Sequence, residues 1–191
     1  MNENDDSVLR LQEEKIGFWK RNLADFLTLS RILIGLTVLA LSLAGKSAYL
    51  TVVILTLSGA VTDIFDGKVA RHFLGTGKEG RLGKHDAEID TFFILSVLAY
   101  FSLSGVFAHR EIGLGWIGLT LICYILSKRD LRVLVVTEVC TVIALLVITL
   151  LYDTSIFFFI IVPAMIIGLF INRHRVLYLL FEYWPVMFRR Q

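Results

Sequence analysis

The chain has 191 residues, of which 56% are hydrophobic, and a formal net charge of +2 at pH 7. Its mean hydropathy of +0.72 is too high for a soluble domain of this size, so the composition excludes a soluble enzyme and indicates an integral membrane protein. So small a net charge gives no indication of nucleic-acid binding.

Six apolar stretches follow one another along the chain and predict six membrane-spanning helices, because a spanning helix needs roughly 20 largely apolar residues. Five of them carry no charge, and the fifth in chain order carries only Glu138. They cover residues 32–44, 48–62, 91–108, 112–126, 133–152 and 154–171. The fourth is short and contains three glycines, so an interfacial segment is the alternative there. The predicted fold is an all-α, polytopic membrane protein.

Residues 1–25 precede the first stretch and mix Leu9, Leu11, Ile16 and Phe18 with charged residues. This pattern is typical of an amphipathic helix that lies on the membrane surface, and it contains no apolar core of a cleaved signal peptide. We therefore expect a cytoplasmic amphipathic segment over 1–25, one six-helix domain over 26–172 and a cytoplasmic tail over 173–191.

Lys and Arg occur mainly in alternate segments: before the first stretch, between the second and third, between the fourth and fifth, and after the sixth. The segments on the other side contain only Lys46 and Arg110. Cytoplasmic segments of membrane proteins hold the excess of these cations. We therefore expect both termini, and the loop after the second stretch, to face the cytoplasm.

Four aspartates flank that cytoplasmic loop. The second helix should continue through Asp63 and Asp66, which share one face at about 100° per residue, and Asp86 and Asp90 lie one turn apart at the start of the third helix. Consecutive spans are antiparallel, so both pairs lie at the same membrane interface. All four carboxylates are therefore expected to converge, whereas Glu88 should point elsewhere.

Clustered carboxylates repel one another and need a compensating cation. Oxygen ligands without His or Cys indicate a hard ion, Mg²⁺ or Mn²⁺, which commonly keeps open positions for substrate phosphates. The alternative is that these are ordinary interfacial charges. Gly67 and Ala70 share the face of Asp63, and their small size leaves room for a ligand. Arg71 offers a guanidinium that would bind diphosphate oxygens; the alternative is that it anchors the topology.

The stretch "DIFDGKVAR", residues 63–71, followed by Asp86 and Asp90, resembles the signature of the CDP-alcohol phosphatidyltransferases, D-x2-D-G-x2-A-R-x8-G-x3-D-x3-D. Gly80 lies at the signature distance after Arg71, but five residues instead of three separate it from Asp86, and Gly83 leaves only two. A two-residue insertion in the loop accounts for this difference, with either glycine in the family role.

The resemblance implies transfer of a phosphatidyl or related group from a CDP-linked lipid, such as CDP-diacylglycerol, to an acceptor hydroxyl, with release of CMP. By position it implies that Asp63, Asp66 and Asp86 bind the metal ions and that Asp90 is the general base and a further ligand. It also implies a CDP site lined by Asp63, Asp66, Gly67, Ala70, Arg71 and Gly80 or Gly83. Members of this family are often homodimers.

The acceptor is left open among glycerol 3-phosphate, serine, an inositol phosphate and phosphatidylglycerol. Lys128, Arg129 and Arg132 cluster before the fifth stretch, where they would bind a phosphorylated acceptor or anchor the topology. Arg31 reaches the same cavity or snorkels to the headgroups. These cations, and the likeness of "NLADFLTLSRI" to the family's entry to its first span, favour glycerol 3-phosphate, which would give phosphatidylglycerophosphate.

Two other functions compete with the enzymatic one: a small transporter, and a catalytically inactive membrane scaffold with the same fold. Transporters typically show mid-membrane charges, broken helices and inverted repeats. Here the aspartates lie at one interface, Pro163 is the only proline within a span, and the two halves do not resemble each other. Glu138 is the one charge deep within a span, so it should face the bundle interior and a water-filled or polar cavity.

Overall fold

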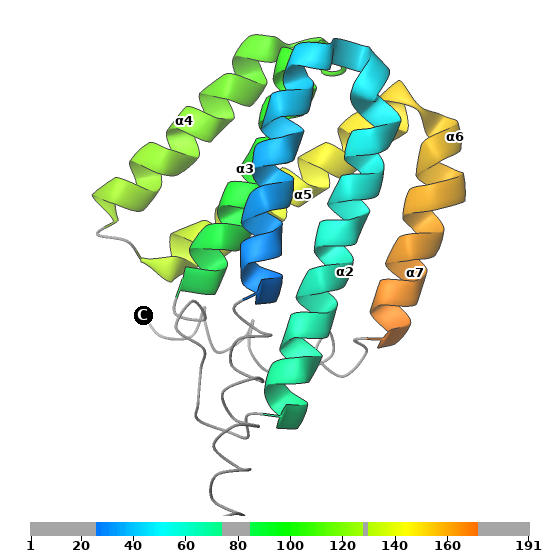
Figure 1. Cartoon of the computed structure of the whole chain (residues 1–191). Coiled ribbons are helices and arrows are strands. Elements are labelled where there is room, and N and C mark those ends of the chain that lie inside the picture. Colours follow the sequence, from blue (N-terminus) through cyan, green and yellow to red (C-terminus); the bar gives the residue numbers. More distant parts are fainter. Residues whose placement is uncertain (1–25, 74–84, 128–129, 172–191) are drawn as a thin grey trace, which may run out of the picture. The chain divides into compact units, whose positions relative to one another are not determined.

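The computed structural model describes residues 26–73, 85–127 and 130–171, and for residues 64–73 it describes only the helical backbone. All regular structure in this part of the chain is helical (Figure 1). The expected all-α fold is therefore confirmed. The amphipathic segment over 1–25 and the tail over 173–191 lie outside the described residues.

Each of the six apolar stretches forms a helix. The first lies in a helix over residues 26–41, and the 3-10 segment η1 (Ser42–Ala48) follows it. The others lie largely in the helices α2 (Tyr49–Phe73), α3 (Asp86–Leu103), α4 (Arg110–Leu126), α5 (Leu131–Tyr152) and the consecutive elements α6 (Thr154–Ile156), η3 (Phe157–Ile161) and α7 (Val162–Ile171).

Two apolar stretches extend beyond their helices. The helix over 26–41 and α3 end before Gly45 and Gly105, whose φ angles are +65° and +78°. Glycine adopts this left-handed conformation without steric penalty, so the chain can reverse direction there. The hydroxyl of the buried Tyr100 fixes the first reversal by donating a hydrogen bond of 2.9 Å to the Gly45 carbonyl.

Among the described residues, three helical stretches are long and apolar enough to cross a membrane: Phe26–Asp63, Leu131–Tyr152 and Thr154–Ile171. The first contains 38 residues and includes the reversal at η1. Many large apolar side chains are exposed, as expected of residues that contact lipid, among them Leu33, Ile122, Ile125, Phe159 and Phe170. The chain is therefore an integral membrane protein.

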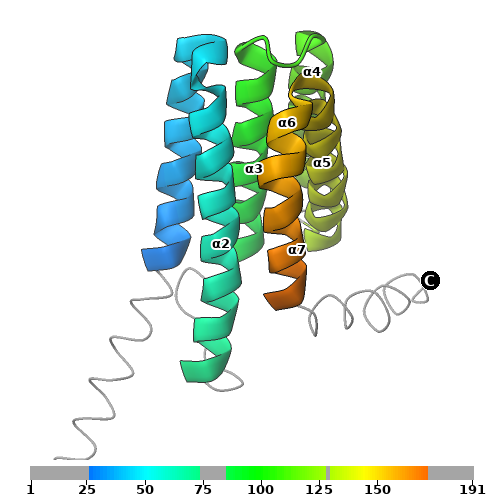
Figure 2. The ribbon, with the colours of Figure 1, turned by 90° about the vertical axis from the view of Figure 1, so that its right-hand side faces the viewer.

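The chain divides into two compact units at Ile148 and Thr149, and each is described by itself. In the first unit, Figures 1 and 2 show the helix over 26–41 alongside α2, to which η1 joins it. The core lies along α3, which contributes ten buried residues. α4 packs against α3, and its Trp116 donates a 2.8 Å hydrogen bond from Nε1 to Thr141 Oγ1 of α5.

In the second unit, Asp153 caps the last helical segment by accepting a 3.0 Å hydrogen bond from the Ile156 backbone N–H. The π-helical turn η3 directly precedes α7, where Pro163 lacks the N–H that an α-helix would use. The altered hydrogen bonding of η3 accommodates this missing donor, so the segment continues as a helix through Ile171.

Candidate active site

The second helix continues past the apolar stretch, as the sequence predicts. α2 runs through Asp63 and Asp66 to Phe73 without interruption. Asp66, Gly67, Ala70 and Arg71 therefore lie on helical backbone, but their side chains are outside the described part of the structure. Gly80, Gly83, Lys128 and Arg129 lie outside the described residues altogether.

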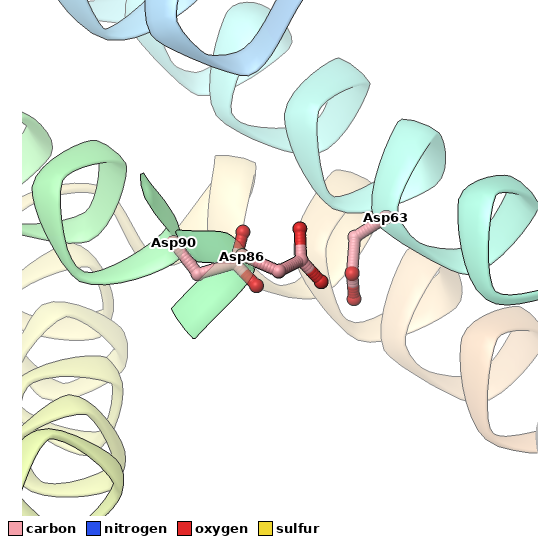
Figure 3. A group of neighbouring side chains, drawn as sticks. All are labelled: Asp63, Asp86 and Asp90. Atoms are coloured by element: carbon pink, nitrogen blue, oxygen red, sulfur yellow. The ribbon is translucent and has the colours of Figure 1, made fainter. Parts of the chain in front are cut away.

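Three of the four aspartates come together. Asp63 extends from α2, and Asp86 and Asp90 extend from the first turn of α3 and the turn that follows it (Figure 3). Each residue contributes one carboxylate oxygen, and these three oxygens lie within 4.8 Å of one another. The side chains of Asp63 and Asp86 are 41% exposed and that of Asp90 is 24% exposed, so the cluster remains accessible to a ligand.

Arg31, from the helix over 26–41, lies among these carboxylates. Its side chain is only 1% exposed. Nη1 donates to Asp63 Oδ1 at 3.3 Å and also to Asp90 Oδ1, and Nη2 donates to Asp86 Oδ1 at 2.5 Å. This burial argues against the interpretation in which Arg31 snorkels to the headgroups, because a snorkelling side chain would be exposed.

The pairing of Arg31 with the aspartates was not predicted from the sequence. A signal was available, because a cation within an apolar run requires a nearby anion or polar cavity. Which anion it meets depends on how the helix over 26–41 crosses α2 and α3, and sequence spacing within one helix does not specify that crossing.

Two glycines allow the helices to approach closely next to this cluster. Gly59 lies one turn before Asp63, and a Cβ atom built on it would lie 2.5 Å from the ring of Phe93, which follows Asp90 by three residues. Gly35 lies one turn after Arg31, and its Cβ would lie 3.0 Å from Phe92. Both contacts are made with α3. The close packing on α3 therefore sets how near Arg31 and Asp63 lie to the aspartates of that helix.

We expect Gly59→Ala to lower the thermal stability of the purified protein in detergent. The added methyl group overlaps the buried Phe93 ring, and overpacking of this kind costs about 1–3 kcal/mol. Gly115→Ala in α4 is the matched control, because no atom lies within 4 Å of a Cβ at that position. The control should be neutral or stabilising, since alanine favours the helix by about 1 kcal/mol over glycine. Equal melting temperatures for the two variants would contradict this packing.

Glu88 is directed away from the cluster, as predicted. Its Oε1 accepts a hydrogen bond from the Tyr124 hydroxyl of α4, and its Oε2 lies 2.5 Å from Nδ1 of His85. It is not among the carboxylates whose oxygens converge. Glu88 therefore connects α3 to α4 and is a suitable control residue for charge changes at the aspartates.

Glu138 is partly buried and lines a narrow crevice in the first unit that has no room for a water molecule. Its polar neighbours there are four threonines, Thr91, Thr120, Thr137 and Thr141. The four hydroxyls are the polar surroundings expected of this carboxylate, although the crevice is too narrow to be a water-filled cavity. Arg132, in contrast, is exposed near the start of α5 and forms no ion pair with the three described carboxylates.

The donor set of the cluster fits a hard divalent cation. Its three described members are all carboxylates, from two helices, and neither His nor Cys is among them. Mg²⁺ and Mn²⁺ prefer such oxygen ligands and keep coordination positions for phosphate oxygens. An acidic cluster of this kind, next to a buried arginine in an integral membrane protein, is suited to binding a phosphate-containing substrate through metal ions.

The family comparison agrees with this chemistry. The family model for CDP-alcohol phosphatidyltransferase matches residues 21–172, which include every described helix. The chain belongs to this family. It is a phosphotransferase that acts in phospholipid head-group transfer from a CDP-alcohol. Comparison with curated proteins and with solved structures yields no match.

Proposed function

We propose that this protein transfers a phosphatidyl group from CDP-diacylglycerol to an acceptor hydroxyl in a reaction that requires Mg²⁺ or Mn²⁺. The observation that carries this proposal is the convergence of Asp63, Asp86 and Asp90 from two helices. A lipid-linked diphosphate needs its scissile bond held at headgroup depth. Asp63 directly follows the apolar part of α2, and Asp86 and Asp90 lie in the first two turns of α3.

We further propose six membrane spans with both termini and the active site at the cytoplasmic face. Support comes from the six helical stretches and from the distribution of Lys and Arg between them. In this arrangement the C-terminal end of α2 and the N-terminal end of α3 face the same side. Arg132 and the segment before α5 face that side as well.

Asp63, Asp66 and Asp86 would hold the metal ions, with Asp90 as a further ligand. When bound, these ions neutralise the diphosphate and stabilise the departing CMP. The small residues Gly67 and Ala70, which follow Asp66 on α2, would let the nucleotide approach the helix. Arg71 would bind diphosphate oxygens through its guanidinium, and Gly80 or Gly83 would complete the CDP site.

Asp90 is the proposed general base. It would accept the proton of the acceptor hydroxyl while that oxygen forms a bond to the phosphorus attached to diacylglycerol. The bond between this phosphorus and the oxygen of CMP breaks in the same reaction, so CMP leaves with the bonding electrons. A base placed in this way typically contributes about 10²- to 10⁴-fold to the rate.

Glycerol 3-phosphate is the proposed acceptor. Lys128, Arg129 and Arg132 lie together in the sequence before α5 and would bind its phosphate. The exposed position of Arg132 is compatible with recruiting a soluble acceptor. Serine, by comparison, carries no phosphate and would leave these cations without a role.

Release of labelled CMP from CDP-diacylglycerol tests the proposal. Purified protein in lipid vesicles should release CMP only when both Mg²⁺ and an acceptor are present, and glycerol 3-phosphate should give more product than serine or an inositol phosphate. Mass spectrometry of the lipid product would identify the acceptor. Absence of any metal-dependent CMP release would contradict the proposed reaction and would support a transporter or an inactive scaffold instead.

A further inference from the structure

One guanidinium connects three carboxylates in the first unit of the chain. Arg31 belongs to the helix over 26–41, Asp63 to α2, and Asp86 and Asp90 to α3. Its two terminal nitrogens contact one oxygen of each carboxylate. A single cation therefore ties together three helices at the site where the acidic side chains converge.

Because Arg31 is buried, its ion pairs affect the stability of the folded protein. The side chain is 1% exposed, so its charge is not solvated by bulk water and depends on the carboxylates. The carboxylates in turn would repel one another without a cation among them. Removing one partner from such a group leaves uncompensated charge, which is strongly destabilising.

The charges also indicate what happens when a metal ion binds. One arginine and the three described aspartates sum to a charge of −2, which a divalent cation would neutralise. The ion and the guanidinium would draw on the same three side chains. The two cations repel each other within one site, so the guanidinium should lower the affinity for the metal ion. A bound metal ion should likewise reduce the stabilisation that the guanidinium provides.

We propose that Arg31 is a positioning residue: it is the internal counter-ion that holds the metal ligands together before metal binds, and a bound divalent ion then takes over much of this role. The inference rests on the proposed function in one respect, that the acidic cluster binds a divalent ion. Because the ion stabilises the folded state by its binding free energy, it should stabilise a protein without this arginine more than it stabilises the wild type.

The test compares Arg31→Met with wild type by thermal unfolding in detergent, once with a chelator and once with saturating Mn²⁺. In chelator the variant should melt about 5 °C or more below wild type, because three close carboxylates lack their counter-ion. Mn²⁺ should remove most of that difference. Mn²⁺ titration followed by electron paramagnetic resonance, without any lipid donor, should show binding about tenfold tighter in the variant, because one positive charge has left the site.

Two further variants serve as controls. Arg110→Met makes the same chemical change at an exposed arginine at the start of α4, and it should change neither stability nor Mn²⁺ affinity. Arg31→Lys keeps the positive charge and should recover much of the chelator stability. If Arg31→Met lowers the melting temperature equally in chelator and in Mn²⁺, the arginine acts through packing and the inference is wrong.

The result for wild type separates this inference from the proposed function. If wild type binds no Mn²⁺, the metal-dependent function and the inference both fail. If wild type binds Mn²⁺ but the variant binds it with equal or weaker affinity, the proposed function stands and the role assigned to Arg31 is overturned. Should the variant not fold in chelator, its recovery when it is purified in Mn²⁺ supports the inference, and failure in both conditions contradicts it.

Discussion

Asp90→Asn should lower CMP release by about 10²- to 10⁴-fold, the usual contribution of a general base, while CDP binding remains measurable. Asparagine has nearly the shape of aspartate but cannot accept the proton of the attacking hydroxyl. Asp90 is the least exposed of the three clustered aspartates, so its carboxylate is the one best protected from bulk water. Labelled CMP release and CDP binding, measured on the same preparation, give the two quantities.

Glu88→Gln is the matched control for Asp90→Asn. It makes the same amide-for-carboxylate change two residues away on α3, at a side chain that hydrogen-bonds Tyr124 instead of joining the cluster. We expect this control to retain most of its activity. Near wild-type turnover by Asp90→Asn would reject the assignment of Asp90 as the base.

Asp86→Asn should weaken the apparent affinity for Mg²⁺ by more than about 100-fold, because loss of a partner that only orients a ligand already costs about 10- to 100-fold. The substitution removes one of the three carboxylates whose oxygens converge. Activity should recover in part at high Mg²⁺ concentration, which distinguishes a lost ligand from a misfolded protein. The measurement is the dependence of CMP release on Mg²⁺ concentration for wild type, Asp86→Asn and Glu88→Gln.

An unchanged Mg²⁺ dependence in Asp86→Asn would show that the carboxylate is not a ligand. A loss of activity that no Mg²⁺ concentration restores, together with a lowered melting temperature, would instead assign Asp86 to the stability of the Arg31 ion pairs. The contrast with Asp90→Asn is informative, since that variant should lose turnover at every Mg²⁺ concentration.

The helices were predictable because their signal is local. An apolar run of sufficient length must satisfy its own backbone hydrogen bonds in a membrane, so it forms a helix. The sequence also placed Asp86 and Asp90 on one face, since residues four apart are neighbours on a helix. Helix ends were less accurate, because the helix over 26–41 and α3 end before their apolar stretches do, at reversals that contain Gly45 and Gly105.

The geometry between helices was less accessible from sequence. Convergence of Asp63 with Asp86 and Asp90 followed from the antiparallel order of consecutive spans, and the structure confirms it for these three residues. The partners of Arg31 were not predicted, because they depend on helix crossings that the contacts of Gly35 and Gly59 with α3 determine. These glycines carry no periodic signal that distinguishes them from other small residues in apolar helices.

Anomalous diffraction from crystals of the protein grown with Mn²⁺ and CDP would locate any metal ion that the aspartates hold. We expect an anomalous peak between Asp63, Asp86 and Asp90, about 2.0–2.2 Å from their nearest carboxylate oxygens, with the diphosphate of CDP on the other side of the ion. A map with ordered CDP and ordered aspartates but no peak among them, or with a peak bound only by other residues, would contradict it.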